Sequence, residues 1–195
     1  MHFFPSWLTG YASPKKFAQG LKDAPAPQWG LYALLLRGGL NSLLLYLPLA
    51  LMGRTPPTPS YLTFLPTDKY YMVLVLLAPI VFLTQWLLGG SVIHLALRLG
   101  KIPSDIDAIL NLTGMASLVV GGFLLLWDWI WLAAGIGNQY LLGISHLVID
   151  IWGVLLIVTG LQKLLDVPVL QGILLTLLST LSAMPLAVMF MRSPL

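Results

Sequence analysis

The stretch IWGVLLIVTGLQKLLDVPVLQGILLTLLSTL (Ile151–Leu181) holds two apolar runs that are joined by a short polar turn, LDVP (Leu165–Pro168). Each run belongs to a longer apolar block, from about residue 140 to 161 before the turn and from about 169 to 191 after it. A helix of about 20 apolar residues is long enough to cross the hydrocarbon core of a bilayer. Because the turn is so short, the two blocks are predicted to form an antiparallel helical hairpin inside a membrane.

Three further apolar blocks precede this hairpin, at about residues 29–52, 71–97 and 106–127. The blocks are continuously apolar rather than alternating, which favours helices over the strands of a barrel. A helix satisfies all of its backbone polar groups within one segment, as lipid requires. The sequence therefore predicts an all-α fold: a polytopic transmembrane helical bundle of five spans over residues 29–195, preceded by an N-terminal arm over residues 1–28.

The composition excludes several classes of protein. Of the 195 residues, 58% are hydrophobic and 9% are charged, whereas an average soluble domain is about 25% charged. So few charged groups cannot cover a soluble surface, which excludes an ordinary soluble enzyme, a disordered chain and a nucleic-acid-binding domain. The chain has no cysteine, so a disulfide framework and a thiolate metal site are excluded as well.

The basic residues predict the orientation of the chain. With five spans, the arm shares one side of the membrane with the second and fourth connections. That side carries six basic residues, Lys15, Lys16, Lys22, Arg98, Lys101 and Lys163, and the other side carries three, Arg54, Lys69 and Arg192. The positive-inside rule then predicts a cytoplasmic N-terminus and a C-terminus outside, in the plasma or inner membrane if the chain is prokaryotic.

The N-terminal arm contains a helix signal. Ser13 is suited to cap a helix and Pro14 to its first position, and KKFAQGLK follows. Phe17 and Leu21 are four residues apart and share a face, with lysines among the polar positions. This segment is either an interfacial helix on the inner leaflet or a short turn that leads into the first span.

Two polar residues lie inside the first block, Arg37 and, one turn later, Asn41. Ionisable groups at membrane depth are costly and often functional. One interpretation is a site for an anion or a lipid headgroup. The other is that Arg37 snorkels to the inner interface because the span begins near Gly38.

His146 and Asp150 lie four residues apart in the fourth block, so they share a helical face and can pair. With His94 they would suit a metal or a proton relay, but His94 is expected near the opposite end of the membrane. The alternative is a structural hydrogen bond between His146 and Asp150, or an aspartate near the outer headgroups.

Other polar and small residues are expected to serve packing. Asp128 is placed beside Trp127 in an interfacial connection over Trp127–Gln139, without a function. Interhelical hydrogen bonds are expected from Gln85, Asn111, Thr113 and Gln171. Close helix approach is expected at Gly89–Gly90, Gly114, Ser117 and Gly121–Gly122, and kinks at Pro48, Pro79 and Pro185.

Two stretches resemble the Yip1 family of small integral membrane proteins. The first is SPKKFAQGLKDAPAPQWGLYALLLRGGLNSLL (Ser13–Leu44), and the second is the hairpin sequence Ile151–Leu181; between them, GKIPSDIDAILNLTGMASLV (Gly100–Val119) stands where members begin a third span. The resemblance covers about residues 13–192 and implies five spans, a cytoplasmic N-terminus and no enzymatic activity. The DLYGP-type motif of eukaryotic members does not occur before the first block, so no Rab-linked role carries over.

No catalytic motif, metal site or cofactor site is predicted. The leading hypothesis is a non-enzymatic membrane protein of the Yip1 type, which organises membranes or partner proteins. The expected partners are membrane lipids and a membrane protein or a second copy of the chain, not nucleic acid. The alternative is a small transporter or channel with a polar path, for which the candidate residues are Arg37, Asn41, His94, Asn111, His146 and Asp150. A third hypothesis is a lipid-handling protein with Arg37 at a headgroup.

Overall fold

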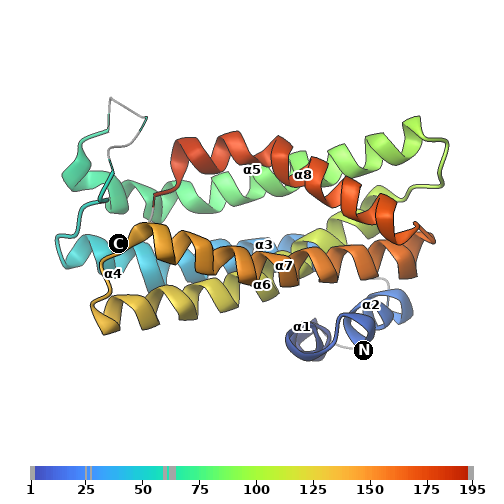
Figure 1. Ribbon diagram of the computed structural model, residues 1–195, viewed down its shortest axis with the longest axis horizontal. Coiled ribbons are helices and arrows are strands. Elements are labelled where there is room, and N and C mark those ends of the chain that lie inside the picture. The colour runs from blue at the N-terminus through green and yellow to red at the C-terminus, as the bar shows by residue number, and fades with distance from the viewer. Residues whose placement is uncertain (1–2, 25, 27, 59–60, 62–64, 193–195) are drawn as a thin grey trace.

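The computed structural model describes residues 3–24, 26, 28–58, 61 and 65–192 and is an all-α helical bundle (Figure 1). Five helical segments are long and apolar enough to cross a membrane, which marks an integral membrane protein. They are α3 with η1 and α4 (Gln28–Asn41, Ser42–Tyr46, Leu47–Leu51), α5 (Tyr70–Leu99, preceded by the short η2, Thr67–Lys69), α6 (Ile106–Ala134), α7 (Gln139–Leu165) and α8 (Val169–Phe190). The predicted five-span bundle is therefore confirmed.

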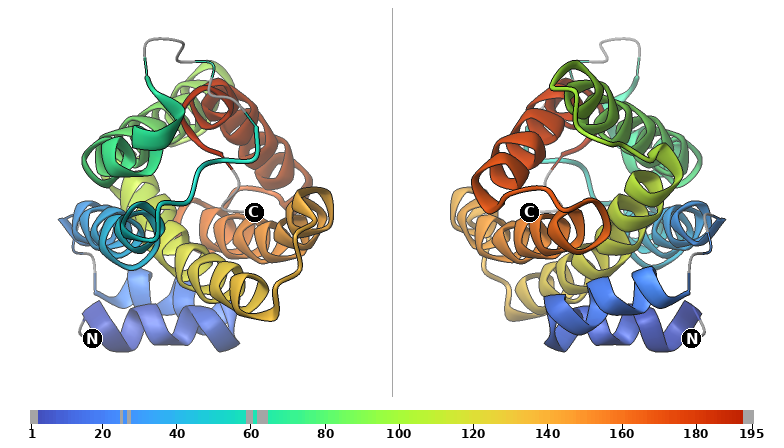
Figure 2. Two further views of the ribbon diagram at one scale, coloured as in Figure 1. Left: turned by 90° about the vertical axis from the view of Figure 1, so that its left-hand side faces the viewer. Right: turned by 90° about the vertical axis from the view of Figure 1, so that its right-hand side faces the viewer.

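The five segments surround a common axis when the bundle is seen end-on (Figure 2). α6 packs against α3, α5 and α7, and α8 packs against α5 and α7. We call the end with the α5–α6 and α7–α8 connections the arm end, and the end with residues 52–58 and 135–138 the loop end. α7 and α8 meet at the arm end and diverge toward the loop end (Figure 1).

Local sequence signals explain most helix boundaries. The side chain of Asp105 accepts from the backbone N–H groups of Asp107 and Ala108 and caps α6, and α5 ends at Leu99, with Gly100 as its C-cap. α6 continues beyond Trp127 to Ala134 and ends at Gly135, which adopts a left-handed conformation with φ 66°. The predicted connection over Trp127–Gln139 is therefore wrong for most of its length, because α6 continues through Trp127 until the left-handed Gly135 ends it.

The first span is irregular where a proline enters it. A π-helical turn, η1, precedes Pro48. Because Pro48 has no backbone N–H, the carbonyl of Leu44 lacks its usual helical donor four residues later. The indole N–H of Trp129 on α6 donates to that carbonyl at 2.7 Å. A neighbouring helix thus compensates the break, as lipid-embedded backbone requires.

Glycine permits a close helix crossing between α3 and α6. A Cβ atom on Gly114 would overlap the backbone of Gly30, and one on Gly30 would overlap the carbonyl of Leu110. The close approach that was predicted at Gly114 is confirmed. This crossing determines which face of α3 is directed toward the interior of the bundle.

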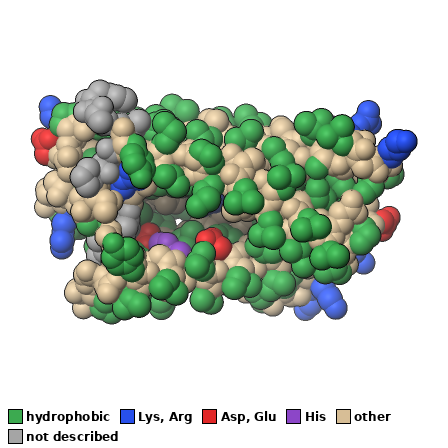
Figure 3. Space-filling view, turned by 45° about the horizontal axis from the view of Figure 1, so that its top comes forward, with side chains coloured by type: hydrophobic (Ala, Val, Ile, Leu, Met, Phe, Trp, Pro, Cys, Tyr) green, Lys and Arg blue, Asp and Glu red, His purple; other side chains and the backbone are tan. Residues whose placement is uncertain are grey.

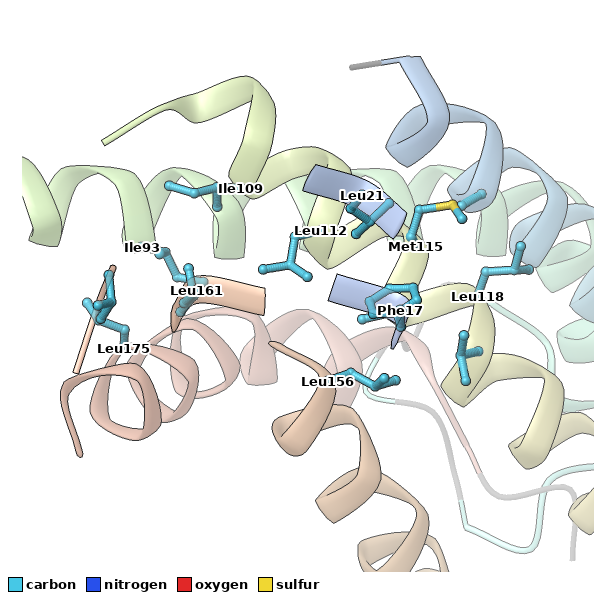
Figure 4. Packing of buried hydrophobic residues seen from close by; sticks show 14 of the residues in the cluster. Phe17, Leu21, Ile93, Ile109, Leu112, Met115, Leu118, Leu156, Leu161 and Leu175 are labelled. Carbon is cyan, nitrogen blue, oxygen red and sulfur yellow. The ribbon is translucent and has the colours of Figure 1, made fainter. Parts of the chain in front are cut away.

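The arm forms two helices, α1 (Phe3–Ala12) and α2 (Pro14–Asp23), which lie across the bundle axis (Figure 2). The hydroxyl of Ser13 accepts from the N–H of Lys16 at 3.3 Å, so α2 begins at the predicted cap. Its apolar face is turned to the protein: Phe17 and Leu21 are 0% and 2% exposed and pack among residues of α6 and α7 (Figure 4). The arm is therefore a docked helical hairpin, not a lead-in turn.

Candidate functional site

The loop-end half of the bundle contains an open cavity with charged and polar side chains in a largely apolar wall. Its volume is about 900 Å³, and its walls come from α3, α5, α6, α7 and α8. It adjoins a deeper cavity of about 370 Å³, because Arg37, Phe82, Met184, Ala187 and Met191 line both. The space-filling view in Figure 3 shows a hollow in this half of the molecule, with Asp and His side chains at its floor. We refer to the two connected spaces as the cavity.

Arg37 is the central residue of the cavity wall. Its Nη1 donates to the hydroxyl of Ser117 on α6, and its guanidinium carbon lies 4.5 Å from the centre of the Phe82 ring. A Cβ atom on Gly121 would lie 2.8 Å from Nε of Arg37. Ser117 and Gly121 are one turn apart on α6, so they form a seat for the arginine side chain.

The position of Arg37 contradicts the snorkelling interpretation. α3 begins at Gln28, so Arg37 lies about 14 Å along the helix, at about 1.5 Å per residue. Because the α3–α6 crossing turns this face inward, the guanidinium extends into the bundle. Its Nε atom is buried and has no hydrogen-bond partner. The small pair at Ser117 and Gly121 thus accommodates an arginine rather than a second helix backbone.

His146 pairs with Asp128 and not with Asp150. Nε2 of His146 lies 2.9 Å from Oδ1 of Asp128, whose residue is 6% exposed. The pair forms because α6 extends past Trp127 and lies beside α7, where the Trp127 indole also donates to the Ser145 hydroxyl at 2.7 Å. The structure therefore contradicts a His146–Asp150 bond, which was one of the alternatives, and the interfacial position expected for Asp128.

Asp150 lines the deeper part of the cavity, as does Arg37. The two side chains are close enough to interact electrostatically. No nitrogen of Arg37, however, lies within 4.0 Å of a carboxylate oxygen of Asp150. An exposed carboxylate and a guanidinium therefore share one cavity without a direct ion pair.

The remaining predicted residues separate into two groups. Asn41 lines the cavity. His94 bonds to the hydroxyl of Ser104 at 2.8 Å at the arm end, and Asn111, 4% exposed, lines a separate pocket there. Gln85 donates to the carbonyl of Ala183 at 3.4 Å, so it joins α5 to α8 as predicted.

Three of the expected interhelical bonds do not form as predicted, and one of them is that of Asn111, whose buried Oδ1 has no hydrogen-bond partner. The hydroxyl of Thr113 bonds the carbonyl of Ile109 on its own helix. Gln171 is half-buried near the start of α8. Among the described residues, no cluster of three His, Asp, Glu or Cys side chains suits a metal ion.

The cavity is closed toward the arm end. There, buried apolar side chains fill the space between the helices (Figure 4): Ile93, Ile109, Leu112, Leu161 and Leu175. Leu97 belongs to the same cluster. In this conformation the polar path that a channel would need is interrupted by the core.

The cavity opens sideways, between the diverging helices α7 and α8. Met184 and Val188 of α8 line it and are 53% and 43% exposed, and Gly143 of α7 lines it and is exposed. At the loop end Arg192 lies over the ring of Tyr61, 4.6 Å from its centre, and both residues line the cavity. The side opening is bordered by apolar atoms, and the loop end carries a second cation.

Asp128 is the site residue that sequence reasoning missed. A signal was present, because Ser117, Gly121 and Asp128 follow one another at spacings of four and seven residues and so share one face of α6.

In comparisons with known proteins, no family model matches this chain, and no curated protein or solved structure matches it.

Proposed function

We propose that this integral membrane protein binds an anion-bearing lipid or similar amphiphile, which enters the cavity from the bilayer between α7 and α8. The observation that carries the proposal is the buried Nε of Arg37, which has no partner and lies in the wall of a cavity with a side opening. Arg37 serves as the anchor for the anionic group. The protein is proposed to act by binding, without catalysis.

The charge of Arg37 supports this proposal. A guanidinium at membrane depth is unfavourable unless charged or polar groups compensate it. The described contacts of Arg37 are one hydroxyl, from Ser117, and one aromatic ring, from Phe82. A guanidinium presents five N–H donors in a planar fork that matches phosphate and carboxylate oxygens. An anionic group in the cavity would engage donors that the protein leaves unused.

The shape of the site supports a ligand from the bilayer over one from water. The side opening is bordered by apolar side chains, including Met184 and Val188. A headgroup in the cavity would therefore leave its acyl chains outside, in contact with lipid-facing helix surfaces. With the N-terminus in the cytoplasm, as the basic residues predict, the loop end and this opening belong to the outer leaflet.

This proposal takes up the lipid-handling hypothesis in preference to the two others. A channel or transporter would need a second conformation that opens the apolar core at the arm end. The membrane-organising role implied by the Yip1 resemblance is compatible with lipid binding, and it becomes the better proposal if no ligand binds at Arg37.

The test is lipid retention by the purified protein. Protein reconstituted with a mixture of phospholipids is re-extracted in mild detergent, and the retained lipid is counted by native mass spectrometry. We expect Arg37→Gln to lower retained lipid at least tenfold relative to the unchanged protein. The matched control is Arg98→Gln, an exposed arginine at the arm end, which leaves retention unchanged. Equal retention by the two variants contradicts the proposal.

A further inference from the structure

We infer that the ligand is a zwitterion, with its anionic group at Arg37 and a primary ammonium group at Asp150; this inference rests on the proposed lipid-binding function. The bilayer molecule with that chemistry is a phospholipid with an ethanolamine headgroup. The charges that remain in the cavity after the contacts within the protein are counted point to this chemistry.

The charges of the cavity fall into an engaged set and an open pair. Asp128 is engaged by His146 at 2.9 Å. Arg192 lies over Tyr61 and donates to the carbonyl of Val188 at 2.6 Å, at the loop end. Arg37 and Asp150 are left, and they face the same deeper space without an ion pair to each other.

A ligand with a single charge would compensate the charge of only one of the two groups, Arg37 or Asp150. An anionic headgroup would compensate Arg37 but would meet the negative charge of Asp150. A cationic ligand would compensate Asp150 but would meet the positive charge of Arg37. A zwitterion whose two charges are a few bonds apart compensates both groups at once, and it brings no net charge into the membrane interior.

The hydroxyl groups around Asp150 favour a primary ammonium over a quaternary one. The hydroxyls of Thr113 and Thr180 line this space, and each donates its proton to a carbonyl of its own helix at 2.9 Å. The hydroxyl of Ser117 accepts from Arg37. These oxygens therefore offer lone pairs to the cavity. An ammonium has three N–H donors for them, whereas a trimethylammonium group has none.

The position of the two groups fits a headgroup that comes from the side. Asp150 lies 11 residues after the start of α7 at Gln139 and 15 before its end at Leu165, or about 16 Å and 22 Å along the helix. The headgroup would thus be drawn below the usual headgroup level, with its chains passing between α7 and α8.

The experiment offers the protein a choice of headgroups. Protein is reconstituted in an equimolar mixture of phosphatidylethanolamine, phosphatidylcholine and phosphatidylglycerol with identical acyl chains, and the retained lipids are quantified by native mass spectrometry. We expect at least a fivefold preference for phosphatidylethanolamine over each of the others. In Asp150→Asn, which removes the negative charge at an exposed position, the preference shifts at least tenfold toward phosphatidylglycerol. Asp107→Asn, an exposed aspartate at the arm end, keeps the original preference.

The outcomes separate this inference from the function on which it rests. If Arg37→Gln abolishes retention while Asp150→Asn leaves the headgroup preference unchanged, the zwitterion inference is wrong and the proposed function stands. If Arg37→Gln retains as much of every lipid as the unchanged protein, both are wrong. Thermal unfolding in detergent verifies that each variant is folded.

A competition arm identifies the source of the headgroup. Soluble glycerophosphoethanolamine is added to the protein that has retained phosphatidylethanolamine. We expect no displacement at millimolar concentrations, because the acyl chains contribute to binding. Displacement at micromolar concentrations would support the zwitterion but overturn its assignment to a lipid.

Discussion

The two halves of this bundle are built from the same five helices and differ in how the space between these helices is filled. At the arm end, apolar side chains fill that space, and the helices of the arm add Phe17 and Leu21 to the same cluster. At the loop end, α7 and α8 diverge and leave a cavity that holds Arg37, Asp150 and the His146–Asp128 pair. The difference indicates that the arm-end half is packed throughout, whereas the loop-end half packs α3 and α5 together and leaves open space beside α7 and α8.

The largest expected effect tests the role of the arm in closing its end. Phe17→Ala removes a side chain that is 0% exposed, and we expect it to lower the free energy of unfolding by about 4 kcal/mol. Phe4→Ala is the control, because Phe4 is 60% exposed on α1, and it changes stability by less than about 0.5 kcal/mol. Reversible unfolding in mixed micelles, followed by tryptophan fluorescence, measures both. Equal effects would show that the arm is not part of the core.

The next prediction compares one glycine from each half. In Gly114→Ala the new methyl group meets the backbone of Gly30, so α3 and α6 must separate, and we expect a loss of about 3 kcal/mol. Gly143 has nothing within 4 Å of the added Cβ and lines the cavity. Gly143→Ala therefore keeps or raises stability, by up to about 1 kcal/mol from helix propensity. The same unfolding measurement applies, and a loss at Gly143 as large as that at Gly114 would remove the contrast between the halves.

The features that can be predicted from the sequence also differ from those that depend on contacts between distant helices. The five spans follow from composition alone, because 20-residue apolar blocks have few other structures available. The direction of Arg37 could not be read from α3, because it depends on the Gly30–Gly114 crossing with a helix far along the chain. The partner of His146 depends on the length of α6, which continues past its predicted end at Trp127 to Ala134.

The arm shows a third kind of limit. No helix is predicted before Ser13, whereas α1 spans Phe3–Ala12, with Pro5 in its first turn, where a proline is tolerated. The faces of α2 were predicted correctly from the spacing of Phe17 and Leu21. That these residues meet protein rather than lipid could not be predicted, because both surroundings are apolar.

A smaller effect on stability, with a larger one on binding, is expected at the seat of Arg37. Gly121→Ala places a methyl group 2.8 Å from Nε of a long side chain that can move, so we expect a loss of about 1 kcal/mol. Because the guanidinium must shift, retained lipid falls severalfold in the same protein. Unfolding and native mass spectrometry are run on one preparation. A variant that loses stability and keeps its lipid would separate Arg37 from binding.

The smallest effect concerns the pH dependence of the arm. Burial raises the pKa of the Tyr11 hydroxyl above its ordinary value of 10.0, where its ring packs against Phe123 at 4.8 Å between ring centres. The neutral form is thus favoured when the arm is docked, so this contribution is complete below pH 10 and is lost as the pH rises through the higher folded-state pKa. Hydrogen exchange of α1 measured from pH 9 to 11.5, and corrected for intrinsic exchange, is expected to show loosening that Tyr11→Phe removes. Identical pH profiles would mean that Tyr11 ionisation is not linked to docking.

The central claim, that Arg37 is the anchor for a lipid headgroup, is tested most directly at its own nitrogen. Labelling with ¹⁵N-arginine gives side-chain signals from Arg37, Arg54, Arg98 and Arg192 alone, and Arg37→Gln assigns the signal of interest. Because Nε of Arg37 has no partner, adding phosphatidylethanolamine to delipidated protein in detergent is predicted to shift its N–H resonance and leave that of Arg98 in place. An Arg37 resonance that does not move while lipid saturates the micelles would contradict the account.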